Sequence, residues 1–493
     1  MGIEPQAMVA PILTFLVFGP MLAGVATFLL PRNSVADGLA ILFGILQLIV
    51  LVPLGGALVI DGPQILALGE NALPLGIPLY VDGLALAMLW LTGLVGLATS
   101  VYASGWLRAV EHPSGHEYRS VALLLWAGLN ALFMSGDLFN LYVALEITTL
   151  ASVALVALSR GAHALAAAVR YLYFALVGSI LFLLGVALVY AETGLLALPE
   201  LAQHPDWGPG RFVALAAITA GLAMKAALFP LHGWLPRAHS AAPAPASALL
   251  SALVAKASAY LVIRLWTGAF DGIWTPDLGQ ALGAVGAAGI LFGSVQALRQ
   301  DRLKPVIAYS TIAQLGYLLL LVPLASLLAW QGVIYHAVVH GLAKAALFLA
   351  AGNLILGIGH DRLSGLAGCD RTLSKNLLAI AVAGVCIAGL PPTGGFIAKW
   401  WLISAALEQG QWWWAILIAG GGLLAALYLF RVLSFAVLNP SPESSGPLQV
   451  SQRHLDRAML WPPMLLAFAA LMLGFAGELF APFLAVGAPG GWS

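Results

Sequence analysis

Residues 376–405 read NLLAIAVAGVCIAGLPPTGGFIAKWWLISA. This apolar stretch exceeds the roughly 20 residues that a helix needs to cross a bilayer. Its middle, Gly389 to Gly395, holds two prolines and three glycines. Proline removes a helical donor and bends the axis, and lipid tolerates the freed carbonyl groups only inside protein or beside water. The stretch therefore predicts a membrane helix that breaks in mid-span, directly before Lys399.

The composition of the whole chain agrees with a membrane environment. Of the 493 residues, 61% are hydrophobic and 9% are charged, against about 25% charged residues in a soluble domain. We expect a single all-α, multi-pass membrane domain over residues 1–493, surrounded by the lipid bilayer. A formal net charge of zero gives no basic face for a nucleic-acid partner. Two cysteines, Cys369 and Cys386, are too few for a disulfide framework or a zinc site, so no cofactor or metal is expected.

Apolar stretches between charged or Pro/Gly-rich breaks predict about fourteen membrane-spanning helices. They cover 9–30, 38–60, 79–105, 119–135, 138–158, 164–191, 212–230, 243–267, 278–298, 304–322, 329–356, 376–405, 412–437 and 459–486.

The charges in the loops provide a second argument for this number. Lys and Arg concentrate in alternate loops, as the positive-inside rule requires of cytoplasmic loops. The residues on that side are Arg32, Arg108, Arg119, Arg160, Arg237, Arg299, Arg302, Lys304, Arg362, Arg371, Lys375, Arg453 and Arg457. The opposite loops contain only Arg211, and the termini carry Glu4 and Glu478. We expect both termini on the non-cytoplasmic side of a bacterial cytoplasmic (inner) membrane.

A second predicted span, 212–230, is interrupted in a related way. Lys225 precedes Pro230 and Pro236, so this seventh span also breaks near a lysine. The seventh and twelfth spans enter the membrane from opposite sides and lie five spans apart. This is the arrangement that two inverted five-helix repeats produce. The predicted organisation is three N-terminal helices (1–110), repeat one (119–267), repeat two (278–437), and a loop with helix 14 (438–493).

Titratable residues inside the apolar segments are the candidate functional groups, because buried charges in membranes usually mark ion or proton pathways. Glu146 lies mid-span in 138–158, Lys225 lies at comparable depth, and Lys256 lies mid-span in 243–267 without an evident acid. A purely structural ion pair between Glu146 and Lys225 is the alternative reading.

His336, His340 and Lys344 have the spacing i, i+4, i+8, which places them on one stripe of a helix. Imidazole can accept a proton on one nitrogen and give one from the other, so the stripe predicts a proton relay. Satisfied core histidines are the alternative, more so for His336 than for His340. A metal site at the histidine pair is disfavoured, because no carboxylate or thiolate ligand accompanies it at that depth.

Three further residues lie toward the ends of the predicted pathway. Lys399 follows the break in span twelve and could deliver protons to the outside, or its ammonium could instead snorkel outward to the membrane surface. His239 and Lys304 lie at the inner ends of their spans and could take up protons from the cytoplasm. Solvated loop charges that only set the topology are an equally good explanation of these two.

Several long motifs, in order, resemble the proton-translocating antiporter family. This family comprises the large subunits of Mrp sodium/proton antiporters and the antiporter-like subunits of respiratory complex I and membrane-bound hydrogenases. The resemblance covers nearly the whole chain. Its motifs are Asp137-Leu-Phe-Asn-Leu-Tyr-Val with Glu146, Lys225-Ala-Ala-Leu-Phe-Pro-Leu-His-Gly-Trp-Leu-Pro-Arg-Ala-His239, the run to Lys256, Leu303-Lys-Pro-Val-Ile-Ala-Tyr-Ser-Thr-Ile-Ala-Gln-Leu-Gly316, the histidine stripe, and Gly389-Leu-Pro-Pro-Thr-Gly-Gly-Phe-Ile-Ala-Lys399.

The resemblance implies roles for individual residues. Glu146 would pair with Lys225, Lys256 and His340 would form a hydrated central axis, and Lys399 would be the terminal group. His336 matches the family less firmly than His340. A lysine at position 399 favours the D-type Mrp chain or the N-type complex I chain, and the wording Asp-Leu-Phe-Asn-Leu-Tyr resembles the D-type Mrp chain more closely.

The resulting functional hypothesis is a proton-translocating subunit of a multisubunit sodium/proton antiporter, with other membrane subunits as partners and no catalytic chemistry of its own. The alternative is a proton-pumping N- or M-type subunit of a complex I-like quinone reductase or a membrane-bound hydrogenase, whose redox centres lie on other chains. A membrane subunit of an inorganic-carbon uptake complex is a weaker alternative.

Overall fold

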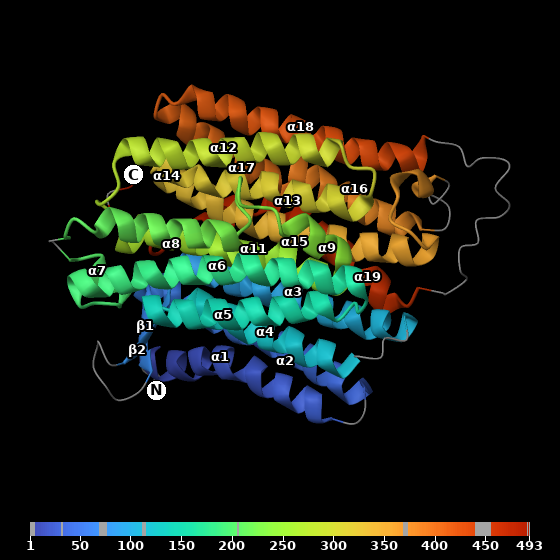
Figure 1. Ribbon diagram of the computed structural model, residues 1–493, viewed down its shortest axis with the longest axis horizontal. Coiled ribbons are helices and arrows are strands. Elements are labelled where there is room, and N and C mark those ends of the chain that lie inside the picture. The colour runs from blue at the N-terminus through green and yellow to red at the C-terminus, as the bar shows by residue number, and fades with distance from the viewer. Residues whose placement is uncertain are drawn as a thin grey trace.

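The computed structural model of the chain describes residues 5–30, 33–68, 76–110, 115–204, 207–367, 373–438, 455–490 and 492. Five residues named above, Glu4, Arg32, Cys369, Arg371 and Arg453, lie outside the described residues. The described residues form a bundle of long helices that run roughly parallel to one another (Figure 1).

The N-terminal part combines four helices with a short β-hairpin. The helices are α1 (Pro5–Leu29), α2 (Asn33–Asp61), α3 (Gly83–Ala109) and α4 (Gly115–Met134), and the antiparallel strands are β1 (Gln64–Leu68) and β2 (Ile77–Val81). The expectation of a helix from residue 79 is wrong, because residues 77–81 pair with β1 instead. The Asp82 carboxylate accepts a hydrogen bond from the Ala85 amide at 2.9 Å, and this cap begins α3 at Gly83.

The middle of the chain combines long helices with short and less regular ones. They are α5 (Leu138–Ala157), α6 (Ala162–Thr193), α7 (Leu198–Leu201), α8 (Arg211–Lys225), α9 (Leu235–Ala241), α10 (Ala244–Leu249) and α11 (Ala255–Arg264). Two π-helical turns, Leu250–Val254 and Leu265–Ala269, flank α11. The predicted span 243–267 is thus one helical rod with two π-helical segments.

The C-terminal part returns to long helices. They are α12 (Pro276–Leu298), α13 (Leu303–Leu319), α14 (Leu321–Leu324), α15 (Leu327–Ile358), α16 (Ser374–Ala388), α17 (Gly394–Glu408), α18 (Trp412–Val437), α19 (Arg457–Met472) and α20 (Gly477–Ala485). Both predicted interruptions are present, since α8 ends at Lys225 and α16 is separated from α17 by residues 389–393.

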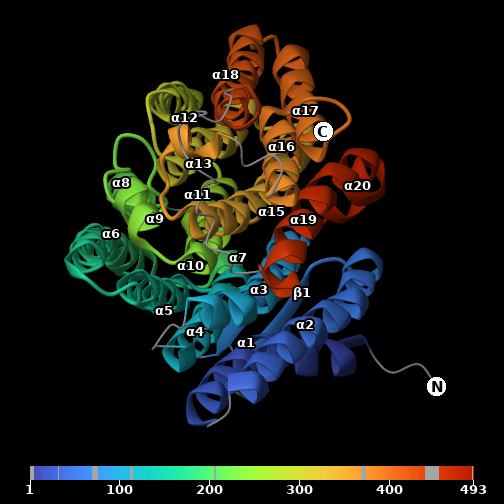
Figure 2. The ribbon, with the colours of Figure 1, turned by 90° about the vertical axis from the view of Figure 1, so that its right-hand side faces the viewer.

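Three helical rods form the interior of the bundle. Figure 2, which looks along the helices, places α10, α11, α13 and α15 inside, with α1, α2, α6 and α18 toward the periphery. In the most apolar part of each rod, the share of buried residues is 100% for Ala244–Ala269, 89% for Leu303–Leu324 and 83% for Leu327–Ile358. In the most apolar part of each of the four peripheral helices, this share is 39%. The exposed faces of these peripheral helices carry large apolar side chains such as Ile49, Ile180 and Leu423, as a lipid environment demands.

Eleven helical segments among the described residues are long and apolar enough to cross a membrane. The other three predicted spans correspond to α4 and to the two interrupted segments. α4 carries Glu117, Arg119 and Asn130, and α8, α16 and α17 each have only 15 residues because the breaks shorten them. The protein is therefore an all-helical, multi-pass membrane protein apart from one small hairpin among the described residues.

The hairpin marks one end of the bundle. Gly83 at the start of α3 donates its amide hydrogen to the carbonyl oxygen of Val486 at 2.9 Å, so the chain after α20 lies at this end. α1 also begins at this end (Figure 1). At the opposite end of α3, Arg108 donates to Asp456 at 2.7 Å, and this hydrogen bond lowers the pKa of the Asp456 carboxyl below its usual value.

Candidate functional site

Glu146 and Lys225 form an ion pair between α5 and α8. The Lys225 Nζ lies 2.9 Å from Glu146 Oε1 and donates to the Thr149 hydroxyl at 2.9 Å. The Ser179 hydroxyl of α6 donates to the same Glu146 oxygen. The lysine side chain is 3% exposed and the glutamate side chain 21% exposed. The ammonium therefore has a full counter-charge and a second hydrogen-bond acceptor, as a buried cation requires.

The close approach of α6 to α8 brings these groups together. A Cβ atom on Gly221 would lie 2.4 Å from the Gly178 carbonyl oxygen, so only glycine permits this helix contact. α8 ends directly after Lys225, where Ala227 adopts a left-handed φ of 54°. The Trp234 indole donates to the Met224 carbonyl oxygen at 2.9 Å, which also accepts from the Ala227 amide at 3.3 Å, so this carbonyl at the break is doubly bonded.

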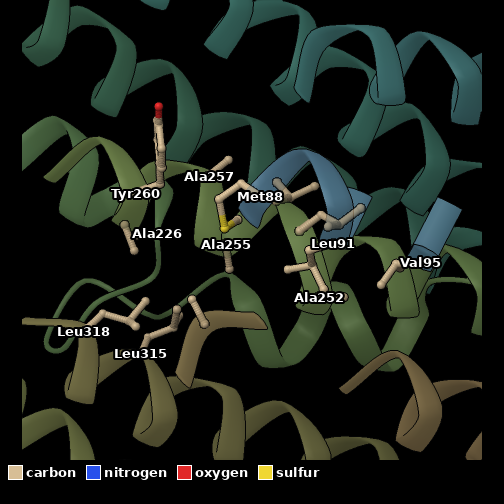
Figure 3. Close-up of a cluster of buried hydrophobic side chains, with 14 of the residues drawn as sticks. Met88, Leu91, Val95, Ala226, Ala252, Ala255, Ala257, Tyr260, Leu315 and Leu318 are labelled. Atoms are coloured by element: carbon tan, nitrogen blue, oxygen red, sulfur yellow. The ribbon is translucent and has the colours of Figure 1, made fainter. Parts of the chain in front are cut away.

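Lys256 occupies the first turn of α11, just after the π-helical turn. Its Nζ donates to the Ser251 carbonyl oxygen at 2.9 Å, and the residue is 1% exposed. No carboxylate oxygen of a described residue lies within salt-bridge distance of it. Figure 3 shows why the rod packs so closely here: Ala252, Ala255 and Ala257 lie in an apolar cluster with side chains of α3 and α13.

The predicted stripe of α15 is buried in the bundle interior. His336, His340 and Lys344 are 3%, 2% and 0% exposed. The two imidazole rings stack with their centroids 5.7 Å apart. Lys344 donates to the Ile307 carbonyl oxygen at 2.5 Å and to the Ser310 hydroxyl, so it too is held without an acid. Lys256, Lys344 and Lys399 all lie close enough to His340 for their charges to interact with it.

Lys399 turns back toward the break that precedes it. Its Nζ donates to the carbonyl oxygens of Ile387 at 2.8 Å and Ala388 at 3.0 Å, which are the last carbonyl groups of α16. The negative end of a helix dipole attracts a cation at this position. The residue is 5% exposed, so the outward-snorkelling alternative does not describe it. Gly389 makes the turn with φ +78°, and Thr393 caps α17.

His239 and Lys304 lie together beside the central helices. His239 of α9 is fully buried with its ring stacked on Phe348, and the charges of Lys344, Lys304 and Lys256 reach it. Lys304 donates to the Ala242 carbonyl oxygen at 2.7 Å. The alternative of a solvated loop charge is therefore wrong for His239.

Several polar neighbours of the site carry no charge and were not predicted. Thr149 and Ser179 bind the ion pair, the Ser251 hydroxyl contacts that of Thr311 at 2.8 Å, and Ser310 binds Lys344. Polar residues on one face of 303–319 are the only sequence signal that could have indicated some of them.

A second buried ion pair was also missed. Arg264 of α11 donates to both carboxylate oxygens of Asp82, one of them at 2.7 Å, and to the Tyr260 hydroxyl at 2.9 Å. An arginine inside an apolar span was the available signal. Among the described residues, no group of three or more His, Cys, Asp or Glu side chains is placed to hold a metal ion.

Comparison with known proteins places the chain in one family. Residues 135–425 match the family described as NADH:quinone oxidoreductase/Mrp antiporter, TM. The chain is 38% identical over 418 residues to the N subunit of the NADH-quinone oxidoreductase of Desulforudis audaxviator, covering 82% of this chain and 83% of that one. It is 30% identical over 426 residues to the D subunit of the Na(+)/H(+) antiporter of Alkalihalophilus pseudofirmus, covering 85% and 84%.

A solved structure extends this similarity to the fold. A chain of the Mrp complex from Dietzia sp. DQ12-45-1b superposes with a TM-score of 0.87 at 27% identity, over 96% of both chains. The family match, the relatives and the solved structure agree with one another on the family. The chain belongs to the NADH:quinone oxidoreductase/Mrp antiporter family and is an antiporter-like membrane subunit.

Proposed function

We propose that the chain translocates protons along Lys225, Lys256, His340 and Lys399, with the Glu146–Lys225 ion pair as the switch. His336, Lys344, His239 and Lys304 are secondary relay or uptake groups in this proposal. The observation that carries it is the way the lysines are held. Lys256, Lys344 and Lys399 each donate to backbone carbonyl oxygens, and no carboxylate of the described residues pairs with them.

This arrangement suits proton movement for an electrostatic reason. A lysine held by neutral carbonyl groups can give up its proton without leaving a buried carboxylate unpaired. Because His340 is within reach of the charges of Lys256, Lys344 and Lys399, a proton on one group repels protons on the others. Opening or closing the Glu146–Lys225 pair would change the field at the next group and so push a proton along the row.

We propose the following architecture and orientation for this mechanism. Fourteen membrane helices contain two inverted five-helix repeats, 119–267 and 278–437, after N-terminal helices in 1–110 and before helix 14 in 438–493. The two interrupted helices support it, and so do the start of α1 and the end of α20, which lie at the same end of the bundle. Both termini then face away from the cytoplasm in a bacterial inner membrane.

We propose that the assembly is a multisubunit sodium/proton antiporter in which this chain is the D-type member. The 30% identity to the D subunit of the Na(+)/H(+) antiporter of Alkalihalophilus pseudofirmus supports this assignment. The second candidate is an N-type member of a complex I-like quinone reductase, favoured by the 38% identity to the N subunit of such an enzyme. Purifying the native complex separates them: small antiporter subunits accompany the first, and iron–sulfur and flavin subunits accompany the second.

The proton pathway is tested with Glu146→Ala and Lys225→Ala in the native complex, reconstituted into vesicles with a pH-sensitive dye inside. We expect both variants to assemble and to lose proton flux, whether a sodium gradient or a redox substrate drives it. Wild-type flux in an assembled Lys225→Ala complex would remove these two residues from the mechanism.

A further inference from the structure

One face of α13 carries three polar side chains that the proton pathway described above does not use. Ser310, Gln314 and Tyr317 have the spacing i, i+4, i+7, so they lie along a single stripe of the helix. All three are fully buried.

This stripe contacts the α15 groups on one side and Lys399 on the other. Ser310 accepts a hydrogen bond from Lys344, and the main-chain carbonyl oxygen of Gln314 lies 3.3 Å from His336 Nε2. The Tyr317 ring lies 5.1 Å from the His336 ring, and the Lys399 ammonium sits 4.9 Å from the Tyr317 ring centroid. The stripe of α13 therefore occupies the space between the histidines and Lys399.

Several buried polar atoms at this place make no hydrogen bond to any described residue. They are both atoms of the Gln314 side-chain amide, the Tyr428 hydroxyl of α18 and both ring nitrogens of His340. The Tyr428 hydroxyl lies beside the side chains of Ser310 and Gln314, although without good hydrogen-bond geometry to either. Buried amides and hydroxyls in native proteins are almost always partnered, by protein or by water.

A buried glutamine elsewhere in the chain shows the contrast. Gln47 of α2 accepts from the Trp126 indole at 2.9 Å and from the Asn130 amide at 2.8 Å, and it donates to the Leu89 carbonyl oxygen at 3.1 Å. That amide is fully used in joining helices. The Gln314 side-chain amide is equally buried, but it forms no hydrogen bond to a described residue. A buried amide needs a hydrogen-bond partner, so we expect one outside these side chains.

We propose that Gln314 and Tyr428 bind water between α13, α15 and α18, and that this water connects His340 to Lys399. A buried water needs two to four polar partners, and these side chains with His340 and Ser310 offer that number. The inference rests on the proposed proton translocation and assigns it two further positioning residues.

The proton balance of the step is simple. A protonated His340 gives its ring proton to the bound water, the water passes one of its own protons toward Lys399, and the neutral Lys399 amine takes it. Each water forms one O–H bond and breaks one, so no water is consumed. The Gln314 amide orients the water without gaining or losing a proton, whereas the Tyr428 hydroxyl can accept one proton while it releases another.

The test uses Gln314→Leu and Tyr428→Phe in the native complex in vesicles. Tyr428→Phe keeps the ring, Gln314→Leu keeps an apolar side chain of comparable size, and both remove polar atoms. We expect at least about a tenfold loss of proton flux, equivalent to about 1.4 kcal/mol on the transfer step, for Gln314→Leu. Tyr428→Phe should lose less of the proton flux. Thermal stability should fall less in both than in a variant that removes a fully bonded buried amide, because the removed atoms bond to no described residue. Gln314→Asn, which keeps the amide, should retain part of the flux.

Gln47→Leu is the matched control. It removes a fully bonded buried amide, so it should lower thermal stability while the flux per folded complex stays at the wild-type level. A second readout is the infrared band of internal water, assigned by its shift in oxygen-18 water. This band should disappear in Gln314→Leu and remain in Gln47→Leu.

The outcomes separate this inference from the proposal on which it rests. Wild-type flux in Gln314→Leu and Tyr428→Phe, with Lys225→Ala inactive, overturns the water site and leaves the relay standing. Wild-type flux in Lys225→Ala removes Lys225 and Glu146 from the proposed relay. Loss of flux in Gln314→Leu with lowered stability and an unchanged water band assigns the glutamine a structural role and also overturns the inference.

Discussion

The two interrupted helices stabilise a buried lysine in different ways. Lys225 is the last residue before its break, and its ammonium pairs with the Glu146 carboxylate. The hydroxyls of Thr149 and Ser179 form hydrogen bonds to this pair. Lys399 follows its break and is held by two backbone carbonyl oxygens and the face of an aromatic ring. One site balances charge with charge, and the other balances charge with dipoles.

This difference decides what each site can do when the proton leaves. Deprotonation of Lys225 would leave Glu146 as an unpaired anion, so loss of the proton and breaking of the ion pair are coupled. Deprotonation of Lys399 leaves only carbonyl groups at a helix end, where water or another donor can replace the ammonium. In the proposed mechanism, the first site is therefore suited to switching and the second to release.

The largest expected effect comes from replacing each lysine by methionine. Lys225→Met should destabilise the complex by about 2–3 kcal/mol, because it leaves Glu146 without a cation in a mostly buried place. Lys399→Met should cost about 1 kcal/mol or less, because only neutral acceptors lose a donor. The midpoints of thermal unfolding of the purified complexes would show this order, while the proposed relay requires that both variants lose proton flux.

The double variant Glu146→Gln/Lys225→Met is the control for this comparison. Removing the charge of Glu146 together with the lysine should restore most of the stability but none of the flux. Equal destabilisation by the two single lysine variants would mean that the charge-balanced and dipole-balanced sites do not differ as described.

Gly389→Ala sharpens the Lys399 side of the comparison. Gly389 has φ +78°, and a Cβ atom there would lie 2.6 Å from Lys399 Cδ. The substitution should strain the backbone by about 1 kcal/mol and also push the ammonium away from its carbonyl groups. Proton flux should fall by about tenfold, which corresponds to about 1.4 kcal/mol on the transfer step.

Gly410→Ala is matched to this variant. Gly410 has a similar φ of +70°, but a Cβ atom there would meet nothing within 4 Å. It should therefore show the same loss of stability with normal flux. If the two alanine variants have equal flux, the position of Lys399 against α16 does not matter for transport.

The sequence was sufficient to predict the features that depend on composition and on the positions of prolines. Apolar length predicted the eleven long spans, and the prolines after Lys225 and before Lys399 predicted both interruptions. The contact of Glu146 with Lys225 agrees with the expectation of a charge partner for a buried acid. In each case a single residue type has a strong physical consequence in lipid, whatever its neighbours.

The missing features depend on tertiary packing. Any residue has a carbonyl group, so no pattern could indicate that those of Ser251, Ile387 and Ala388 hold lysines. The π-helical turn at Leu250–Val254 has no sequence mark either, because it consists of small and apolar residues. The hairpin was missed because Leu79 and Val81 read equally well as the start of the next apolar helix.

The smallest predicted effect on proton flux concerns the side chains around Lys225. Thr149→Val keeps the shape of the residue and removes one of the two acceptors of the ammonium, which should cost about 1–2 kcal/mol of stability and reduce proton flux severalfold. Thr148→Val on the same helix removes a hydroxyl that bonds only to the Ala144 carbonyl oxygen at 2.8 Å, so its flux should be normal. Equal flux in the two variants would show that Glu146 alone governs Lys225. Because the Lys225 site is built from side chains, single substitutions can adjust it in small steps. The Lys399 site is built from backbone carbonyl groups, so only a change in backbone position, as in Gly389→Ala, can adjust it in the same way.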